Sequence, residues 1–137
     1  MDCAAFFEAA GGQLGETVAE PSQQTAGGQC VYEFYHPRVR DHLGTEGLAT
    51  SFNRSGVVWV PTGRQFAVTL RVPERYGEAV EEALDPAPLA FERTDHRGVS
   101  APDGEMLTVL HFSLRSGGVS EEDVRGTLSA LGTAAAV

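Results

Sequence analysis

The sequence predicts an α+β fold in which a mainly antiparallel sheet of five to six strands packs with three helices, in the order α-(β)-β-β-β-α-β-β-α. Three observations support this prediction. Apolar residues recur at helical spacing in three segments, they alternate with polar residues in shorter segments, and turns rich in Gly or Pro separate the segments. With 137 residues the chain has the length of a single domain, residues 1–137.

The first helix is predicted over residues 3–14, with Asp2 as its N-terminal cap. Its apolar side comprises Cys3, Phe6, Phe7, Ala10 and Leu14. Residues 16–29 are polar, contain no periodic pattern and are expected to form a loop or mobile connector. A short strand is expected at 31–35 (VYEFY), which ends before Pro37.

The sequence of the central part of the chain indicates one helical turn and three further strands. Residues 38–43 (RVRDHL) are expected to form a single helical turn. Segments 48–52 and 56–60 flank a turn sequence, Asn-Arg-Ser-Gly, and therefore predict a hairpin. In 65–72, apolar residues alternate with smaller or polar ones, which indicates one buried and one wet face of a strand.

The last part of the chain predicts two helices with two strands between them. A second helix is predicted over 74–84, where Pro73 precedes an acidic first turn. Strands are expected at 89–94 and 105–115, joined by the polar loop DHRGVSAPDG, and the second of them is apolar enough to lie inside the sheet. Ser120 is a suitable cap for a final helix over 121–131.

The charge of the chain excludes several functions. The formal net charge is −9, and all ten basic residues are arginine. Without lysine the chain has neither a P-loop lysine nor a Schiff-base lysine. The acidic balance argues against charge-driven binding to nucleic acid or to an anionic membrane.

The charge is unevenly distributed, because residues 1–33 carry −5, residues 34–72 carry +3 and residues 73–137 carry −7. The basic block predicts an anion-binding or partner-docking face. Its arginines are Arg38, Arg40, Arg54, Arg64 and Arg71. The alternative is that these arginines are exposed and pair with acids of neighbouring helices.

A cytoplasmic protein without membrane contact is expected. No segment has the 18 or more apolar residues of a membrane span, and the N-terminus lacks the positive charge of a signal peptide. Cys3 and Cys30 match no CxxC spacing, and we expect both to be free thiols.

Catalytic and metal motifs are absent from the sequence. His36, His42 and His96 lie near acidic residues but have no metal-ligand spacing, so no metal site and no cofactor are expected. Asp95 and His96 with a serine form one conceivable catalytic set, but no GxSxG, GxGxxG or HExxH motif accompanies them. Glu92, Asp95 and Glu105 could pair as acid and base, but a domain of this size offers little room for the cleft that a glycosidase needs. We therefore expect a protein that is not an enzyme and has no catalytic residues.

The order of elements, the small size and the acidity resemble those of type III secretion chaperones and the related YbjN proteins. The pattern comprises helices at 2–14, 74–84 and 121–131, separated by three strands and then by two. The resemblance implies a non-catalytic homodimer that binds other proteins through apolar surface. It also implies that the dimer forms through the second helix or a central strand.

The sequence therefore predicts a cytosolic, homodimeric protein-binding module of chaperone-like or regulatory character. The partner-binding residues expected are Phe6, Phe7, Trp59, Arg64, Arg71, Tyr76 and Val80. The alternative is a small-molecule-binding regulatory domain with a pocket between sheet and helices. That pocket would be lined by Trp59, Phe66 and His111 and entered past Arg64 or Arg71.

Overall fold

A computed structural model describes residues 1–24, 27–48, 54–100 and 106–137. The helices are α1 (Cys3–Leu14), α2 (Pro37–Leu48), the 3-10 turn η1 (Glu74–Tyr76), α3 (Gly77–Leu84) and α4 (Glu121–Ala135). The strands are β1 (Ser22–Gln24), β2 (Gln29–Phe34), β3 (Ser55–Val60), β4 (Gln65–Pro73), β5 (Glu92–Ser100) and β6 (Met106–Ser116). The predicted α+β class is confirmed.

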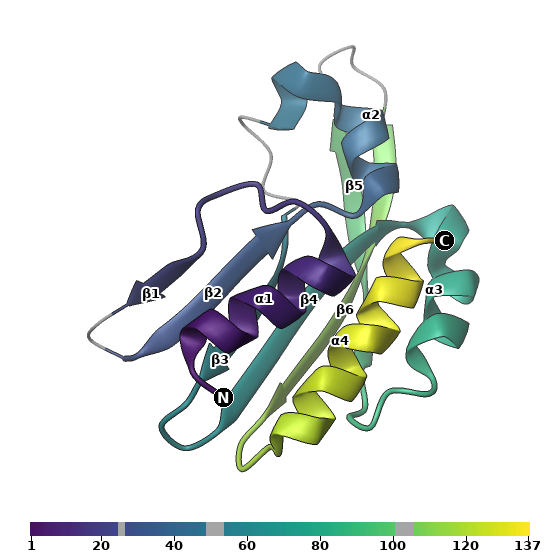
Figure 1. Cartoon of the computed structure of the whole chain (residues 1–137). Coiled ribbons are helices and arrows are strands. Elements are labelled where there is room, and N and C mark those ends of the chain that lie inside the picture. The colour runs from purple at the N-terminus through teal and green to yellow at the C-terminus, as the bar shows by residue number, and fades with distance from the viewer. Residues whose placement is uncertain (25–26, 49–53, 101–105) are drawn as a thin grey trace.

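One six-stranded antiparallel sheet, in the order β1-β2-β3-β4-β6-β5, organises the molecule. Helices α1, α3 and α4 lie side by side on one face of this sheet, and α2 lies at one end of it (Figure 1). The opposite face is not covered by α1, α3 or α4.

The core lies between the sheet and these helices. Buried and half-buried residues alternate along β2, β3 and β4, so every second side chain points toward the helices. The largest buried side chains of the sheet are Phe34, Trp59, Phe66, Leu70, Leu110 and Phe112. Phe6 of α1 meets them with its ring edge toward Phe66, at a centroid distance of 6.3 Å.

Side chains cap two helices as the sequence predicts. An Asp2 carboxylate oxygen accepts a hydrogen bond from the Ala5 N–H at 2.8 Å, and the Ser120 hydroxyl accepts one from the Asp123 N–H at 3.1 Å. The final helix extends beyond its predicted end to Ala135, and Ala134 continues its buried side.

The region between β2 and β3 differs from the prediction. A two-part helix, α2, replaces the expected single turn and includes Leu48, where a strand was expected. Gly44 has φ of +65° and kinks this helix, a conformation that glycine adopts without strain. β3 pairs with β2, where Gly56 is opposite Glu33, and with β4. The remainder of that segment, 49–53, lies outside the described residues.

The expected connector 16–29 also contains pairing. Residues 22–24 form β1, which pairs with the start of β2 at residues 29–31. The Thr17 hydroxyl and the Val18 N–H both donate to the Glu33 carbonyl, at 2.9 and 3.0 Å. Ser22 and Gln23 are exposed at the sheet edge, so β1 has no apolar alternation by which the sequence would reveal it.

At the other edge, the first strand after α3 begins at Glu92 and not at 89, and it continues to Ser100 through residues expected to be a loop. Its register shifts between Asp95 and Gly98. The prediction includes residues 92–94 of this strand but assigns its continuation to a loop, because the sequence DHRGVS has no apolar alternation. The neighbouring β6 lies inside the sheet, as predicted.

A disulfide joins Cys3 to Cys30, so the expectation of free thiols was wrong. Cys30 faces the helices from β2, and Cys3 lies in the first turn of α1 with its Cα 5.4 Å away. The two residues are 27 positions apart in sequence, and only the packing of α1 on the sheet brings them together. The bond therefore fixes α1 to β2.

Replacing Cys3 by Ala is expected to lower the free energy of unfolding by about 3 kcal/mol, because the loop of this length is no longer closed in the unfolded chain. Urea denaturation of protein purified without reductant measures the loss. Dithiothreitol should destabilise the wild type by a similar amount and leave Cys3→Ala unchanged. Two titratable thiols per wild-type chain, counted in urea without reductant, would contradict the bond.

His36 connects α2 to the end of α4. Its side chain is fully buried, and its Nε2 donates to the Ala134 carbonyl oxygen at 2.9 Å. Its Nδ1 accepts the Arg38 N–H at 3.1 Å, so both ring nitrogens are used by a neutral imidazole. Burial lowers the pKa of His36, and the positive charge of Arg38 acts in the same direction, while the Ala134 carbonyl and Asp41 oppose them.

This lowered pKa predicts a loss of stability in mild acid. Below about pH 6.5 the unfolded chain protonates His36 and the folded chain does not. The free energy of unfolding therefore decreases as the pH is lowered, by at most about 1.4 kcal/mol per pH unit. The loss should end once the pH reaches the lowered pKa. Urea denaturation from pH 8 to pH 5 should show a shallower dependence for His36→Gln than for the wild type. Parallel curves for the two proteins would contradict this role.

Candidate functional site

The uncovered sheet face carries a continuous apolar row. Register pairs Val31 with Val58, and Val58 with Ala67, across β2, β3 and β4. These side chains alternate with the buried ones and point away from the helices, and each is half-buried in the single chain. Val60 extends the row along β3. We call Val31, Val58, Val60 and Ala67 the open-face row.

Small, uncharged residues lie beside this row. Gly56, Thr69 and Ser113 follow one another across β3, β4 and β6 in register. A surface made of such short side chains is flat, and a second flat surface can approach it closely. The part of the open face between Arg71 on β4 and Arg115 on β6 is therefore low and free of charge.

Charged side chains mark the borders of the open face. On β2, Glu33 pairs with Arg54 at 2.9 Å. On β6, Arg115 stands opposite Ala67, and on β5, Glu92 stands opposite Ser113. Both charge signs are thus present, at opposite borders of an uncharged centre.

A groove of about 290 Å³ lies on this face near the β3–β4 turn. Val58, Val60 and Ala67 contribute its apolar surface. Gln29, Gln65 and Arg115 contribute its polar surface. The methyl of Ala67 is shorter than the side chains of its neighbours, which leaves the hollow.

The structure does not bring the predicted partner-binding residues together. Phe6, Trp59 and Val80 are buried in the core, so they present no surface to a partner. The indole N–H of Trp59 donates to the Met1 carbonyl oxygen at 3.0 Å. Arg64 is exposed in the β3–β4 turn, with φ of +48°.

The other three predicted residues lie apart from one another. Phe7 is half-buried on α1 and packs against the core. The Tyr76 ring lies below two guanidinium groups, those of Arg38 at 4.9 Å and Arg75 at 5.1 Å. Arg71 lies on the open face, where its Nη1 donates to the Arg54 carbonyl oxygen at 3.2 Å. A binding role for these residues remains a prediction.

The alternative pocket lined by Trp59, Phe66 and His111 does not form. Trp59 and Phe66 are neighbours on the helix-covered face, whereas His111 is opposite Arg71 on the open face. Because side chains alternate along a strand, Trp59 and Phe66 lie on one side of the sheet, and His111 and Arg71 lie on the other. At Trp59 and Phe66 the packed core occupies the space expected for that ligand.

The basic block does not form one face either. Arg54 pairs with Glu33, a strand acid, and the Nε of Arg38 donates to the Val137 carbonyl oxygen at 3.3 Å. Arg64 lies in the β3–β4 turn, at the far end of β3 from Arg54. Arg38 and Arg54 therefore make separate local contacts and do not share one basic surface.

Among the described residues, no group of three or more His, Cys, Asp or Glu side chains is arranged to hold a metal ion. His36 uses both ring nitrogens within the fold. The side chains of Asp95 and His96 lie outside the described part, so the catalytic set built on them is not assessed by the geometry.

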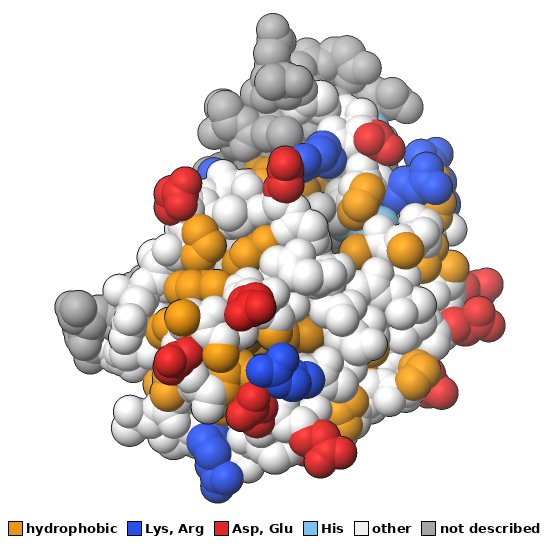
Figure 2. Space-filling model, viewed as in Figure 1, with side chains coloured by type: hydrophobic (Ala, Val, Ile, Leu, Met, Phe, Trp, Pro, Cys, Tyr) orange, Lys and Arg blue, Asp and Glu red, His pale blue; other side chains and the backbone are white. Residues whose placement is uncertain are grey.

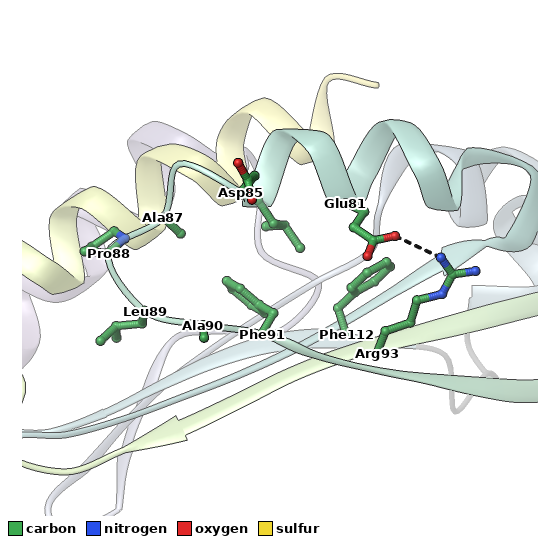
Figure 3. A pocket seen from close by; sticks show the side chains of 10 residues that line it. Glu81, Asp85, Ala87, Pro88, Leu89, Ala90, Phe91, Arg93 and Phe112 are labelled. Carbon is green, nitrogen blue, oxygen red and sulfur yellow. Dashed lines mark hydrogen bonds and ion pairs between the residues drawn. The ribbon is translucent and has the colours of Figure 1, made fainter.

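A second cavity, of about 360 Å³, lies below α3 at the β5 side of the sheet (Figure 3). Leu84, Phe91 and Phe112 contribute apolar surface to it. Glu81 and Arg93 form an ion pair at one end, with 3.0 Å between Oε2 and Nη1. Local sequence patterns do not reveal this cavity, because residues 85–91 carry only the signals of a helix end and of a strand.

The open-face row was also missed, although part of its signal is present in the sequence. The alternation in β4 does predict that Ala67, Thr69 and Arg71 share the wet face. β3 obscures the pattern, because its sequence SGVVWV is apolar on both faces. Only the register shows that Val58 and not Trp59 points outward.

No described helix combines the length and the apolar character that crossing a membrane requires. Comparison with known proteins adds no functional assignment: no family model, curated protein or solved structure matches the chain.

Proposed function

We propose that the chain is a non-catalytic protein-binding module, of chaperone-like or regulatory character, that acts as a homodimer formed through its open sheet face. One observation carries the proposal: an apolar row and a flat, uncharged centre lie on the one sheet face that α1, α3 and α4 leave uncovered. A contiguous apolar surface of this kind is typical of an interface.

Net charge favours this face over the helix-covered one. Two chains of −9 repel each other, so they associate best where acids are fewest. Acidic side chains are spread over the helix-covered face (Figure 2). They include Glu8 of α1, Glu78, Glu81 and Glu82 of α3, and Glu121, Glu122 and Asp123 of α4. On the open face, Glu33 and Glu92 are accompanied by Arg54, Arg71 and Arg115.

The charged borders suit a two-fold contact. A two-fold axis parallel to the strands, between β3 and β4, places β2 of one copy over β6 of the other. The register then places Val31 over Arg115 of the second copy and Glu33 over Ser113, two residues from that arginine along β6, and the same arrangement recurs on the other side of the axis. Val58 and Ala67 of the two copies meet at the centre.

The acidic α3 is a poorer dimer element than the resemblance to secretion chaperones implies. Its exposed side carries Glu78, Glu81 and Glu82, and two such helices side by side bring like charges together. Val80, the apolar residue expected to contact a partner, is fully buried. The sheet face is the better-supported surface.

Cytosolic location is part of the proposal, and the Cys3–Cys30 bond gives a means of testing it. A reducing cytosol keeps most protein thiols reduced. Because Cys30 is buried, cells are quenched in acid and the chain is alkylated in urea; mass measurement should then find modified Cys3 and Cys30. Complete absence of alkylation would indicate an oxidising compartment.

Val58→Glu tests the dimer. The substitution places two carboxylates near each other at the two-fold axis, so the dimer dissociation constant should rise at least about tenfold. Sedimentation velocity over a range of concentrations measures the change, and the wild type should have twice the mass of one chain. Ser129→Glu adds the same charge to the exposed side of α4 and should leave the dimer intact. A wild type that stays monomeric at high concentration, or equal dimerisation of both variants, would contradict the proposal.

A further inference from the structure

The cavity below α3 has the size of a site for one side chain. Its volume of about 360 Å³ lies near the lower end of the range for ligand pockets, about 300–1,000 Å³. A whole nucleotide cofactor would exceed it, whereas a single aromatic or long aliphatic group would occupy it well.

The side of the cavity that the core forms is apolar, while Glu81, Asp85 and Arg93 make the remainder polar. Leu84 and Phe112 belong to the buried core, and Leu89 and Phe91 are half-buried beside them. In Figure 3 the rings of Phe91 and Phe112 point from the sheet side toward α3, with the Glu81–Arg93 pair beyond Phe112. An apolar group entering between α3 and this segment would replace water on these side chains.

The segment 85–91 forms one wall of the cavity and is held in place. Pro86 and Pro88 restrict its backbone, and the Ala87 N–H donates to the Leu84 carbonyl oxygen at 3.0 Å. Pro88 packs so closely on α4 that a Cβ at Gly126 would lie only 3.2 Å from its ring. A wall fixed in this way loses little conformational entropy when a ligand binds.

The surroundings of the cavity are strongly acidic. Glu81 and Asp85 line it, and Glu78 and Glu82 continue the same exposed surface along α3. Arg93 pairs with Glu81. Within the described part of the chain, Glu78, Glu82 and Asp85 form no ion pair. The apolar cavity therefore adjoins three carboxylates that a cationic partner would neutralise.

From this combination we infer that the cavity receives an apolar side chain of a basic peptide segment, whose arginine or lysine side chains pair with Glu78, Glu82 and Asp85. The inference rests on the proposed protein-binding function and adds the chemistry of the partner. The apolar cavity gives the segment its anchor, and the acidic surface selects basic segments over acidic ones. This site lies on the helix-covered face, so a dimer formed through the open face leaves it accessible.

Fluorescence anisotropy with a labelled synthetic peptide tests the inference. The probe carries a central tryptophan flanked by arginines, and it should bind the wild-type chain with a dissociation constant below about 1 mM. Replacing its tryptophan by serine, or its arginines by glutamates, should abolish measurable binding. Added salt should weaken the wild-type complex, because exposed ion pairs are screened.

Two variants separate the apolar and the charged contributions. Ala90→Trp, at an exposed residue that lines the cavity, should fill it and weaken binding about tenfold or more. The double variant Glu78→Gln and Glu82→Gln should weaken binding about threefold to tenfold. Its matched control is Glu8→Gln with Glu122→Gln, which removes the same charge from α1 and α4 and should change binding less than twofold.

Absence of binding to the wild type, undiminished binding of the serine peptide, or equal losses in the two glutamine double variants would overturn the inference. Thermal unfolding of each variant confirms that it is folded. Sedimentation of the same samples keeps the two proposals distinct. If the chain is a dimer but does not bind the peptide, only the proposed peptide site below α3 is refuted. If the chain is a monomer that binds the peptide, only the proposed dimer is refuted.

Discussion

Burial of one face of a single antiparallel sheet is the constraint on which the rest of the structure depends. Trp59, Phe66, Leu70 and Phe112 come from neighbouring strands, and their shared orientation creates an apolar surface that three helices cover. Because side chains alternate along a strand, every residue committed to this core places its neighbours on the other face. The open-face row follows directly from the core.

Local contacts then fix the helices on this frame. The Cys3–Cys30 bond attaches α1 to β2, and the hydrogen bond of His36 to Ala134 attaches the start of α2 to the end of α4. Two side-chain caps define where α1 and α4 begin. The acids that keep these helices well solvated also make their outer face repulsive to a second acidic chain, which directs association to the opposite face.

Sequence alone predicted the fold class, three of the helices and the alternation in β4, since each depends on a local periodic pattern. It did not predict β1 or the full length of β5, because exposed edge strands such as Ser22–Gln24 carry no apolar alternation. It assigned surface roles to Phe6, Trp59 and Val80, which the core buries. In β3, where both faces are apolar, only pairing with β2 and β4 distinguishes Val58 from Trp59. The Cys3–Cys30 bond and the cavity below α3 both depend on contacts between distant segments, which local patterns do not contain.

The central claim is that the open faces of two copies meet with Val58 and Ala67 near the two-fold axis. Isotope-filtered NOE spectroscopy on a mixture of labelled and unlabelled chains tests it most directly, because it detects only contacts between copies. The account predicts intermolecular NOEs between the methyl groups of Val58 and Ala67. A dimer whose intermolecular NOEs arise instead from α1, α3 or α4 would contradict it.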